Sequence, residues 1–425
     1  MMVVSFSDII HLCSAYLLEL KAGLTKDEAI LKATSEVGLA CFFTSITTFF
    51  GFISLSIIPT PIFRLLGAVM GFGVAIALLL AMTLTPILFH YLPEPKTKTP
   101  WKIVDIVDGV IEWIIKHSLT LTSRYSTHLL IFFAVILATC SYGASQITIE
   151  TDFQKRLSKD NHIHRSNDYI KKHFSGTSFI DIYIHAPEGE TLLKSALFDE
   201  LRKVKAELLK FSECDSIISI VDLIDIIHRE MGDGQPLHDN LLSQYLLLFE
   251  MSGGKDLNKF IDYDRKILRL NIRSNEPGLV KLSGYGDRFA ELISQKLPDK
   301  YRVETTGMGY LFGKWVHYIT RGQKAGLLFA FFTTLIIMIF ALKSFKAGML
   351  SMIPNALPII VFGGLLGFLQ DETDSDTIMI AIIAIGMAVD DTIHFLTRLK
   401  IEFDANNDVT TALKRTFHYT GRAII

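Results

Sequence analysis

Two adjacent carboxylates inside an apolar run constrain this chain more than any other feature. Asp390 and Asp391 lie within Ala381–Lys400, part of a run that starts near Thr377 and is apolar enough to cross a bilayer. A charged side chain at the bilayer centre costs about 2.5–3.5 kcal/mol on insertion scales, and two adjacent carboxylates also oppose each other's ionisation. Acids retained at that cost mark ion or proton pathways, so the pair predicts a functional site inside a membrane.

The N-terminal end of the chain carries a similar pattern. Ser5–His11 (SFSDIIH) aligns with Ala388–His394 (AVDDTIH), which sets Asp8 on Asp391. The same register continues without a gap and matches Ile10 with Ile393, His11 with His394, Glu19 with Glu402, Ala22 with Ala405, Ala29 with Ala412, Gly38 with Gly421 and Ala40 with Ala423. Transporters built from parallel repeats place their coupling residues at the repeat interface, so Asp8, Asp390 and Asp391 are predicted partners across a pseudo-twofold axis.

The composition indicates a membrane protein with a soluble insert. Hydrophobic residues make up 50% of the 425 residues, and the mean hydropathy of +0.36 is too high for an ordinary soluble protein of this length. The net charge of −2 gives no reason to expect a nucleic-acid partner. The four cysteines show no pairing framework, and the pair His162 and His164 lacks further ligands at metal-binding spacing. We therefore expect no disulfide, no metal site and no cofactor.

The apolar runs divide the chain into five segments. Residues 1–92 are predicted to be the end of a first transmembrane repeat with three helices, the first of them incomplete. Residues 93–125 have the pattern of a cytoplasmic amphipathic linker, and residues 126–144 that of a helix opening a second repeat. Residues 145–320 have an ordinary polar composition and predict an α+β domain, and residues 321–425 predict a second transmembrane bundle, truncated at its end. The chain is thus predicted to be a fragment of a longer polypeptide.

The periodicity of apolar residues predicts individual elements within these segments. The predicted membrane helices are Met1–Leu18, Leu39–Ile58, Leu65–Leu92, Ser126–Ala144, Gly326–Leu342, Leu350–Leu369 and Thr377–Thr397. In the α+β domain the predicted strands are Phe179–His185 and Lys266–Ile272, and the predicted helices are Leu193–Leu209 and Leu279–Leu297. Pro354 and Pro358 are predicted to start their helix, because proline is favoured in a first turn.

The distribution of charge predicts the orientation. Basic residues gather on one side of the predicted spans, at Lys21, Lys26, Lys32, the linker Lys96–Arg124, Lys343, Lys346, Arg398 and Lys400. The acidic loop Asp371–Asp376 and the α+β domain fall on the other side. Short loops rich in Lys and Arg stay in the cytoplasm, so the α+β domain is predicted to be periplasmic or extracellular.

Several stretches resemble one family, the resistance-nodulation-division (RND) superfamily, and within it the MMPL-like lipid exporters related to sterol-sensing-domain proteins. Gly386–Lys400 resembles the acidic motif on the fourth helix of each repeat, and Ser351–Gly367 resembles the helix before it. Thr44–Leu55 and Thr83–Phe89 are similar to the next two helices of the first repeat, and Asp152–Thr177 is similar to the start of the second porter domain. The resemblance maps the chain from the fourth membrane helix to just inside the eleventh.

The resemblance implies a polytopic α-helical membrane protein with two parallel RND-type repeats, both incomplete, and an extracytoplasmic α+β porter domain. It implies proton-motive-force-driven export of lipids or other hydrophobic compounds across the bacterial inner membrane. The implied proton relay is Asp8, Asp390, Asp391, His394 and His11. The implied partners are a hydrophobic substrate, protons and membrane lipids, and a homo-oligomer is left open.

The first repeat departs from the motif of the second. Val3 replaces the glycine of the motif, and Ser7 stands where the second copy has Asp390, so the two copies supply different numbers of carboxylates. The first three helices and the first porter domain of the family are also missing from the resemblance. We therefore expect the carboxylate site to be asymmetric.

Other interpretations of the same residues remain open. The acids could pair with Ser or Thr for helix packing alone, and His11 and His394 could simply line the cytoplasmic half of the bundle. Thr44, Thr47 and Thr48 either extend the polar path or bond their own backbone. A sterol-sensing-type regulator without transport, for which the acids would be dispensable, is the alternative function.

Two further functional classes are disfavoured. Paired intramembrane aspartates also serve aspartyl proteases, but these acids follow Gly386 as GMAVDD and no GxGD motif is present. We therefore do not expect an enzyme. A protein-translocation auxiliary of the same superfamily typically has a single repeat, whereas this chain carries parts of two.

Overall fold

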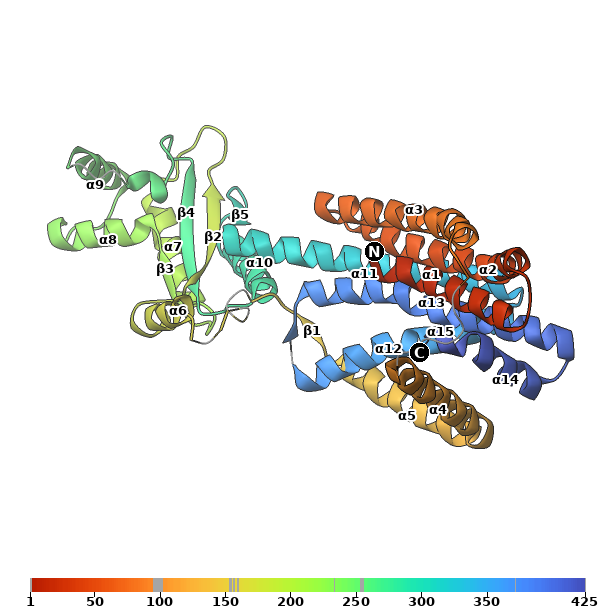
Figure 1. Cartoon of the computed structure of the whole chain (residues 1–425). Helices are drawn as coiled ribbons and strands as arrows, with labels where there is room; N and C mark the ends of the chain where they lie inside the picture. Colours follow the sequence, from red (N-terminus) through yellow and green to blue (C-terminus); the bar gives the residue numbers. More distant parts are fainter. Residues whose placement is uncertain are drawn as a thin grey trace. The chain divides into compact units, whose positions relative to one another are not determined.

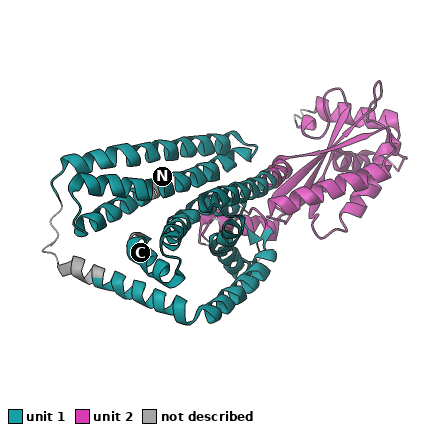
Figure 2. Cartoon of the chain, turned by 90° about the vertical axis from the view of Figure 1, so that its right-hand side faces the viewer, with its two compact units in different colours: residues 1–148, 319–425 teal, residues 149–318 magenta. Residues whose placement is uncertain are grey.

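The protein is described here by a computed structural model that covers residues 2–94, 102–152, 155, 157–158, 160–232, 234–252, 256–370 and 372–424 (Figure 1). The chain forms two compact units, residues 1–148 with 319–425 (unit 1) and residues 149–318 (unit 2), coloured separately in Figure 2. Lys96 and Lys98 of the predicted linker and Asp371 of the predicted acidic loop lie outside the described residues. The boundaries of unit 2 differ by only a few residues from those of the predicted α+β domain, residues 145–320.

Unit 1 is built of helices. Their bounds are α1 (Met2–Lys21), α2 (Lys26–Ile53), η1 (Ser54–Ile57), α3 (Pro61–Tyr91), α4 (Lys102–Arg124), α5 (Ser126–Ser145), α11 (Met308–Leu342), α12 (Phe345–Leu369), α13 (Ser375–Asn406), α14 (Val409–Tyr419) and α15 (Gly421–Ile424). The start of α11, residues 308–318, belongs to unit 2. Among the described residues, six helices are long and apolar enough to cross a membrane: α2 with η1, α3, α5, α11, α12 and α13. Helix α1 is not among these six. Its span therefore stays a prediction.

The prediction for the two prolines of α12 was wrong. Pro354 and Pro358 lie inside the helix, which begins at Phe345. The helix starts earlier because Ser344 caps it, its side chain accepting a hydrogen bond from the backbone N–H of Ala347 at 3.3 Å. A proline removes one backbone donor, and membrane helices tolerate this because neighbouring helices and hydroxyl side chains satisfy the freed carbonyls.

Small residues let α2 and α13 approach closely. A Cβ atom on Gly51 of α2 would lie 2.9 Å from the Cα atom of Gly386 of α13. At the same crossing, the Thr48 hydroxyl donates a hydrogen bond to the carbonyl of Gly386 at 2.9 Å. Without a hydrophobic drive between helices in lipid, association relies on such close packing and hydrogen bonding. This contact fixes how α13 faces the rest of unit 1.

Unit 2 contains a four-stranded antiparallel sheet with the strand order β3-β4-β2-β5. Its strands are β2 (Ser178–His185), β3 (Ser216–Ile218), β4 (Ile267–Ser274) and β5 (Arg302–Thr306). The helices are α6 (His162–His173), α7 (Ser195–Leu208), α8 (Ile220–Met231), α9 (Asp239–Met251), η2 (Leu257–Lys259) and α10 (Leu279–Lys296). Two short strands elsewhere, β1 (Thr148–Ile149) and β6 (Glu372–Thr373), pair with each other. The predicted strands and helices of this domain are confirmed to within two residues.

The core of unit 2 follows the alternation of the two central strands. Every second residue of β2 and β4 is fully buried, namely Ile180, Ile182, Ile184, Leu268, Leu270 and Ile272. Helix α10 packs on the same core through Phe289 and Ile293. Strand residues that alternate in this way place one face of the sheet against helices, as in an α+β domain.

We expect Glu150→Ala to loosen the start of α10. The buried carboxylate of Glu150 accepts hydrogen bonds from the backbone N–H groups of Val280 at 2.7 Å and Lys281 at 3.0 Å. It caps a helix whose own N-cap residue is Gly278, which has no side chain. Loss of such a cap costs about 1–2 kcal/mol, which corresponds to roughly a 5–30-fold faster opening. Hydrogen exchange of the full chain in detergent micelles measures this, with the exposed Glu188→Ala as control, and unchanged exchange in α10 would contradict the assignment.

We expect Gly51→Ala to destabilise unit 1 and Gly38→Ala to be tolerated. Both glycines lie in α2, so the gain in helix propensity is the same in both variants. A Cβ at Gly51 meets the Gly386 backbone, whereas a Cβ at Gly38 lies in ordinary contact with the Met82 sulfur at 3.5 Å. Overpacking costs about 1–3 kcal/mol. Thermal unfolding of the purified chain in detergent tests this, and equal melting temperatures for the two variants would show that the contact is not tight.

Candidate functional site

The two adjacent acids of α13 have different surroundings. The side chain of Asp390 is 14% exposed, whereas Asp391 is exposed on the surface of unit 1. Consecutive helical residues point about 100° apart, so only one of the two can face the same neighbour. Asp8 of α1 is 2% exposed and lies near enough to Asp390 for the two charges to interact. The structure therefore brings Asp8 and Asp390 together and leaves Asp391 apart.

Helix α2 supplies hydroxyl groups to Asp8. The Thr44 hydroxyl donates to one carboxylate oxygen of Asp8 at 3.4 Å, and the Ser45 hydroxyl donates to the other at 3.2 Å. Thr47 instead bonds its own backbone, at the carbonyl of Thr44, and Thr48 bonds Gly386. Of the three predicted threonines, only Thr44 reaches an acid. Ser45 was missed, although it is a polar residue beside Thr44 in an otherwise apolar run.

The two histidines of the register stack on each other. The ring centroids of His11 and His394 lie 3.8 Å apart with an interplanar angle of 6°. The Nε2 atom of His394 lies 3.6 Å from Oδ1 of Asp390, too far for a hydrogen bond. Within the described part of the chain, these two atoms and Nε2 of His11 are buried without a hydrogen-bond partner. Three polar atoms that could accept or release a proton therefore lie unpaired beside Asp8.

Thr392, which follows the two acids on α13, hydrogen-bonds a residue of another helix. Its hydroxyl donates to the side-chain oxygen of Asn355 at 2.6 Å. Asn355 is 2% exposed and belongs to α12. Because Thr392 precedes His394 by two residues, it points to a different neighbour from the histidine. The Thr392–Asn355 hydrogen bond therefore joins α13 to α12 next to the two acids in the sequence.

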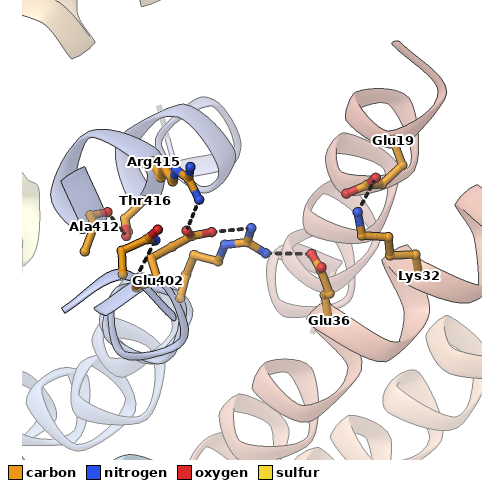
Figure 3. Close-up of polar contacts among 9 residues, drawn as sticks. Glu19, Lys32, Glu36, Glu402, Ala412, Arg415 and Thr416 are labelled. Atoms are coloured by element: carbon orange, nitrogen blue, oxygen red, sulfur yellow. Dashed lines mark hydrogen bonds and ion pairs between the residues drawn. The ribbon is translucent and has the colours of Figure 1, made fainter. Parts of the chain in front are cut away.

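Two ion pairs occupy equivalent positions in the register (Figure 3). Lys32 contacts Glu19 at 2.8 Å, and Arg415 contacts Glu402 at 3.5 Å. Glu19 matches Glu402 in the sequence register, and the same offset of 383 residues carries Lys32 to Arg415. Both glutamates are almost fully buried. The sequence register therefore matches two ion pairs as well as identical residues.

Arg398 lies one helical turn after His394 on α13. The guanidinium of Arg398 donates to Glu36 and to Glu402, both at 2.6 Å. It also lies over the ring of Tyr419, 4.0 Å from the centroid. These partners occupy Arg398, so it does not neutralise the acids Asp8 and Asp390. This cluster was missed in the sequence, where Arg398 appeared only as part of a basic loop.

One group of side chains could hold a metal ion. The donor atoms of Asp8, Cys41 and His394 all lie within 4.8 Å of one another, and all three residues are buried. An oxygen, a sulfur and a nitrogen donor form a set that Zn²⁺ accepts. All four cysteines of the chain are free thiols. The expectation of no metal stays a prediction.

Comparison with known proteins identifies the family. The family model for the MMPL family matches residues 9–105 and 256–425, which is more than half of the chain and includes His11, Asp390, Asp391 and His394. The chain is also similar to the membrane protein MJ1562 of Methanocaldococcus jannaschii, with 37% identity over 304 residues that cover 70% of this chain and 77% of that protein. With its six apolar helices, the protein is a multi-pass membrane protein. The chain belongs to the MMPL family.

Proposed function

We propose that the protein is an RND-type secondary transporter, not an enzyme, that uses the proton-motive force to export lipids or other hydrophobic compounds. One observation carries the proposal. Asp8 of α1 and Asp390 of α13 meet inside the helix bundle beside two stacked histidines. Membership of the MMPL family supports the transport of hydrophobic substrates. The proton relay consists of Asp8, Asp390, His11 and His394.

The relay works through the charge of the buried carboxylates. Two carboxylates that face each other in a low-dielectric bundle repel when both are ionised, and protonation of one removes the repulsion. The Thr44 and Ser45 hydroxyls hold Asp8 in place, so the change of charge acts on the contact between α1 and α13. One proton that crosses 100 mV supplies about 2.3 kcal/mol. That energy biases a two-state bundle by more than tenfold.

The same proposal assigns the orientation and the location. Lys21, Lys26 and Lys32 lie at or near the ends of α1 and α2 that meet in a short turn. By the positive-inside rule this turn is cytoplasmic, in a bacterial inner membrane. Unit 2 is then an extracytoplasmic porter domain. Its substrate, protons and membrane lipids are the proposed partners.

We expect Asp8→Asn to abolish proton-driven transport. The substitution keeps the size of the side chain and one oxygen that can accept from Thr44 or Ser45, and it removes the titratable group. Proteoliposomes with an imposed pH gradient and a fluorescent phospholipid analogue as cargo measure the effect, and the rate should fall at least tenfold. Asp27→Asn, a surface change that weakens only the ion pair with His90, is the control. Undiminished gradient-driven transport by the Asp8 variant would overturn the proton relay, and function that does not depend on the gradient would favour a sterol-sensing-type regulator.

We expect the two acids of α13 to differ in the same assay. Asp390→Asn should lose transport as Asp8→Asn does, because Asp390 interacts with the charge of Asp8 and lies 3.6 Å from His394. Asp391→Asn should retain more of the wild-type rate, because Asp391 is exposed. The reverse order of the two variants would show that the working relay uses the exposed acid.

A further inference from the structure

A cavity of about 40 Å³ lies next to the histidine pair, and its walls follow the sequence register. Four pairs of equivalent positions contribute to the lining: His11 with His394, Ala15 with Arg398, Glu36 with Tyr419, and Val37 with Thr420. Since each pair takes one residue from each predicted repeat, the cavity lies on the predicted pseudo-twofold axis. The stacked histidines form one part of its wall.

Only the histidine pair is identical, and the other three pairs differ in residue type. Arg398, Glu36 and Tyr419, which belong to two of these differing pairs, contact one another. Arg398 replaces Ala15, and Glu36 replaces Tyr419 at the equivalent position. Arg398 donates to Glu36 at 2.6 Å and lies over the Tyr419 ring. An ion pair between α13 and α2 therefore forms part of the cavity wall at positions where the two predicted repeats differ.

The cavity suits water. Its volume exceeds the 10–15 Å³ that one water needs, and water also needs two or more polar partners. The lining includes His11, His394 and Arg398. Within the described residues, Nε2 of each of these histidines and Nε of Arg398 are buried without a hydrogen-bond partner. Buried polar atoms are usually satisfied, so these three atoms indicate bound water between the histidines and the ion pair.

We propose that this cavity is a water-filled proton release site and that the Arg398–Glu36 ion pair is its gate. The inference rests on the proposed function, in which Asp390 passes its proton towards the histidines. Two imidazolium rings stacked at 3.8 Å would repel strongly, so the pair carries one proton at a time. Water in the cavity takes that proton and transfers it outward when the gate opens.

When the gate opens, Arg398 and Glu36 each keep a neighbour of opposite charge. Removing one partner from a buried ion pair is strongly destabilising, because the other charge stays unpaired. Arg398 also bonds Glu402 at 2.6 Å, so it keeps a carboxylate partner when Glu36 leaves. Glu36 lies one helical turn from Lys32 on α2, and the two charges already interact. Each half of the gate therefore has a second partner on its own helix.

Thiol accessibility tests the gate without measuring transport. Ala40 lines the cavity, so Ala40→Cys in a chain whose native cysteines are changed to Ser places a reporter inside it. A charged methanethiosulfonate reagent reacts with hydrated thiols, and it is added to proteoliposomes from one face at a time. We expect Glu36→Gln to raise the reaction rate of Cys at position 40 at least tenfold, only from the face that carries Lys21 and Lys26. Asp27→Asn, a neutralising change elsewhere on α2, should not raise the rate.

Each other outcome separates the gate from the proposed function. Equal rates with and without Glu36→Gln, or reaction from the opposite face, would overturn the gate. Glu36→Asp keeps the charge but shortens the side chain, so it should give an intermediate rate and covers the case in which Glu36→Gln does not fold. An opened cavity in Glu36→Gln together with normal transport by Asp8→Asn would leave the gate in place and reject proton coupling.

Discussion

The burial of carboxylates between helices is the constraint on which unit 1 depends. Asp8 is 2% exposed, and such a group is stable inside a bundle only when neighbours satisfy its oxygens or when it is protonated. Thr44 and Ser45 of α2 provide the hydrogen bonds. Their helix can hold this position because Gly51 lets it pack directly on Gly386 of α13. The close crossing of α2 and α13 therefore positions Asp390 as well. The same helix contact determines both the packing of the bundle and the position of the buried acids.

Much of the fold could be predicted because its signals are local. The strands β2 and β4 follow from strict alternation, and the membrane helices follow from the length of their apolar runs. The start of α12 could not be found in the same way. Proline favours a first turn in soluble helices, but Ser344 caps α12 ten residues before Pro354, and lipid-embedded neighbours tolerate the missing donor. The error lay in applying a rule for water-exposed helices to a membrane helix.

The residue types of the candidate site could be predicted from the sequence. The direction in which each side chain points could not. The register matched Asp8 with Asp391, and equivalence in a repeat says nothing about which acid points inward. That choice depends on the rotation of α13, which the glycine crossing with α2 sets. Ser45 and Asn355 were missed for the same reason, since each acts on a residue from another helix. The ion pair of Glu402 with Arg415 could have been found, because it repeats that of Glu19 with Lys32 once Lys and Arg are treated as equivalent.

In the proposed transporter, the differences between the two predicted repeats give the proton path a direction. If both copies were alike, the carboxylates and the stacked histidines would see the same surroundings from either repeat. Ser7 in place of Asp390 puts the second inward acid on α13 alone, and Ala15 in place of Arg398 puts the gate cation there too. Glu36 of α2 forms the ion pair with Arg398. The carboxylate, the histidine and the arginine then lie in order along one helix, at positions 390, 394 and 398, one turn apart. The direction of the proposed proton path therefore depends on the divergence of the two predicted repeats at these positions.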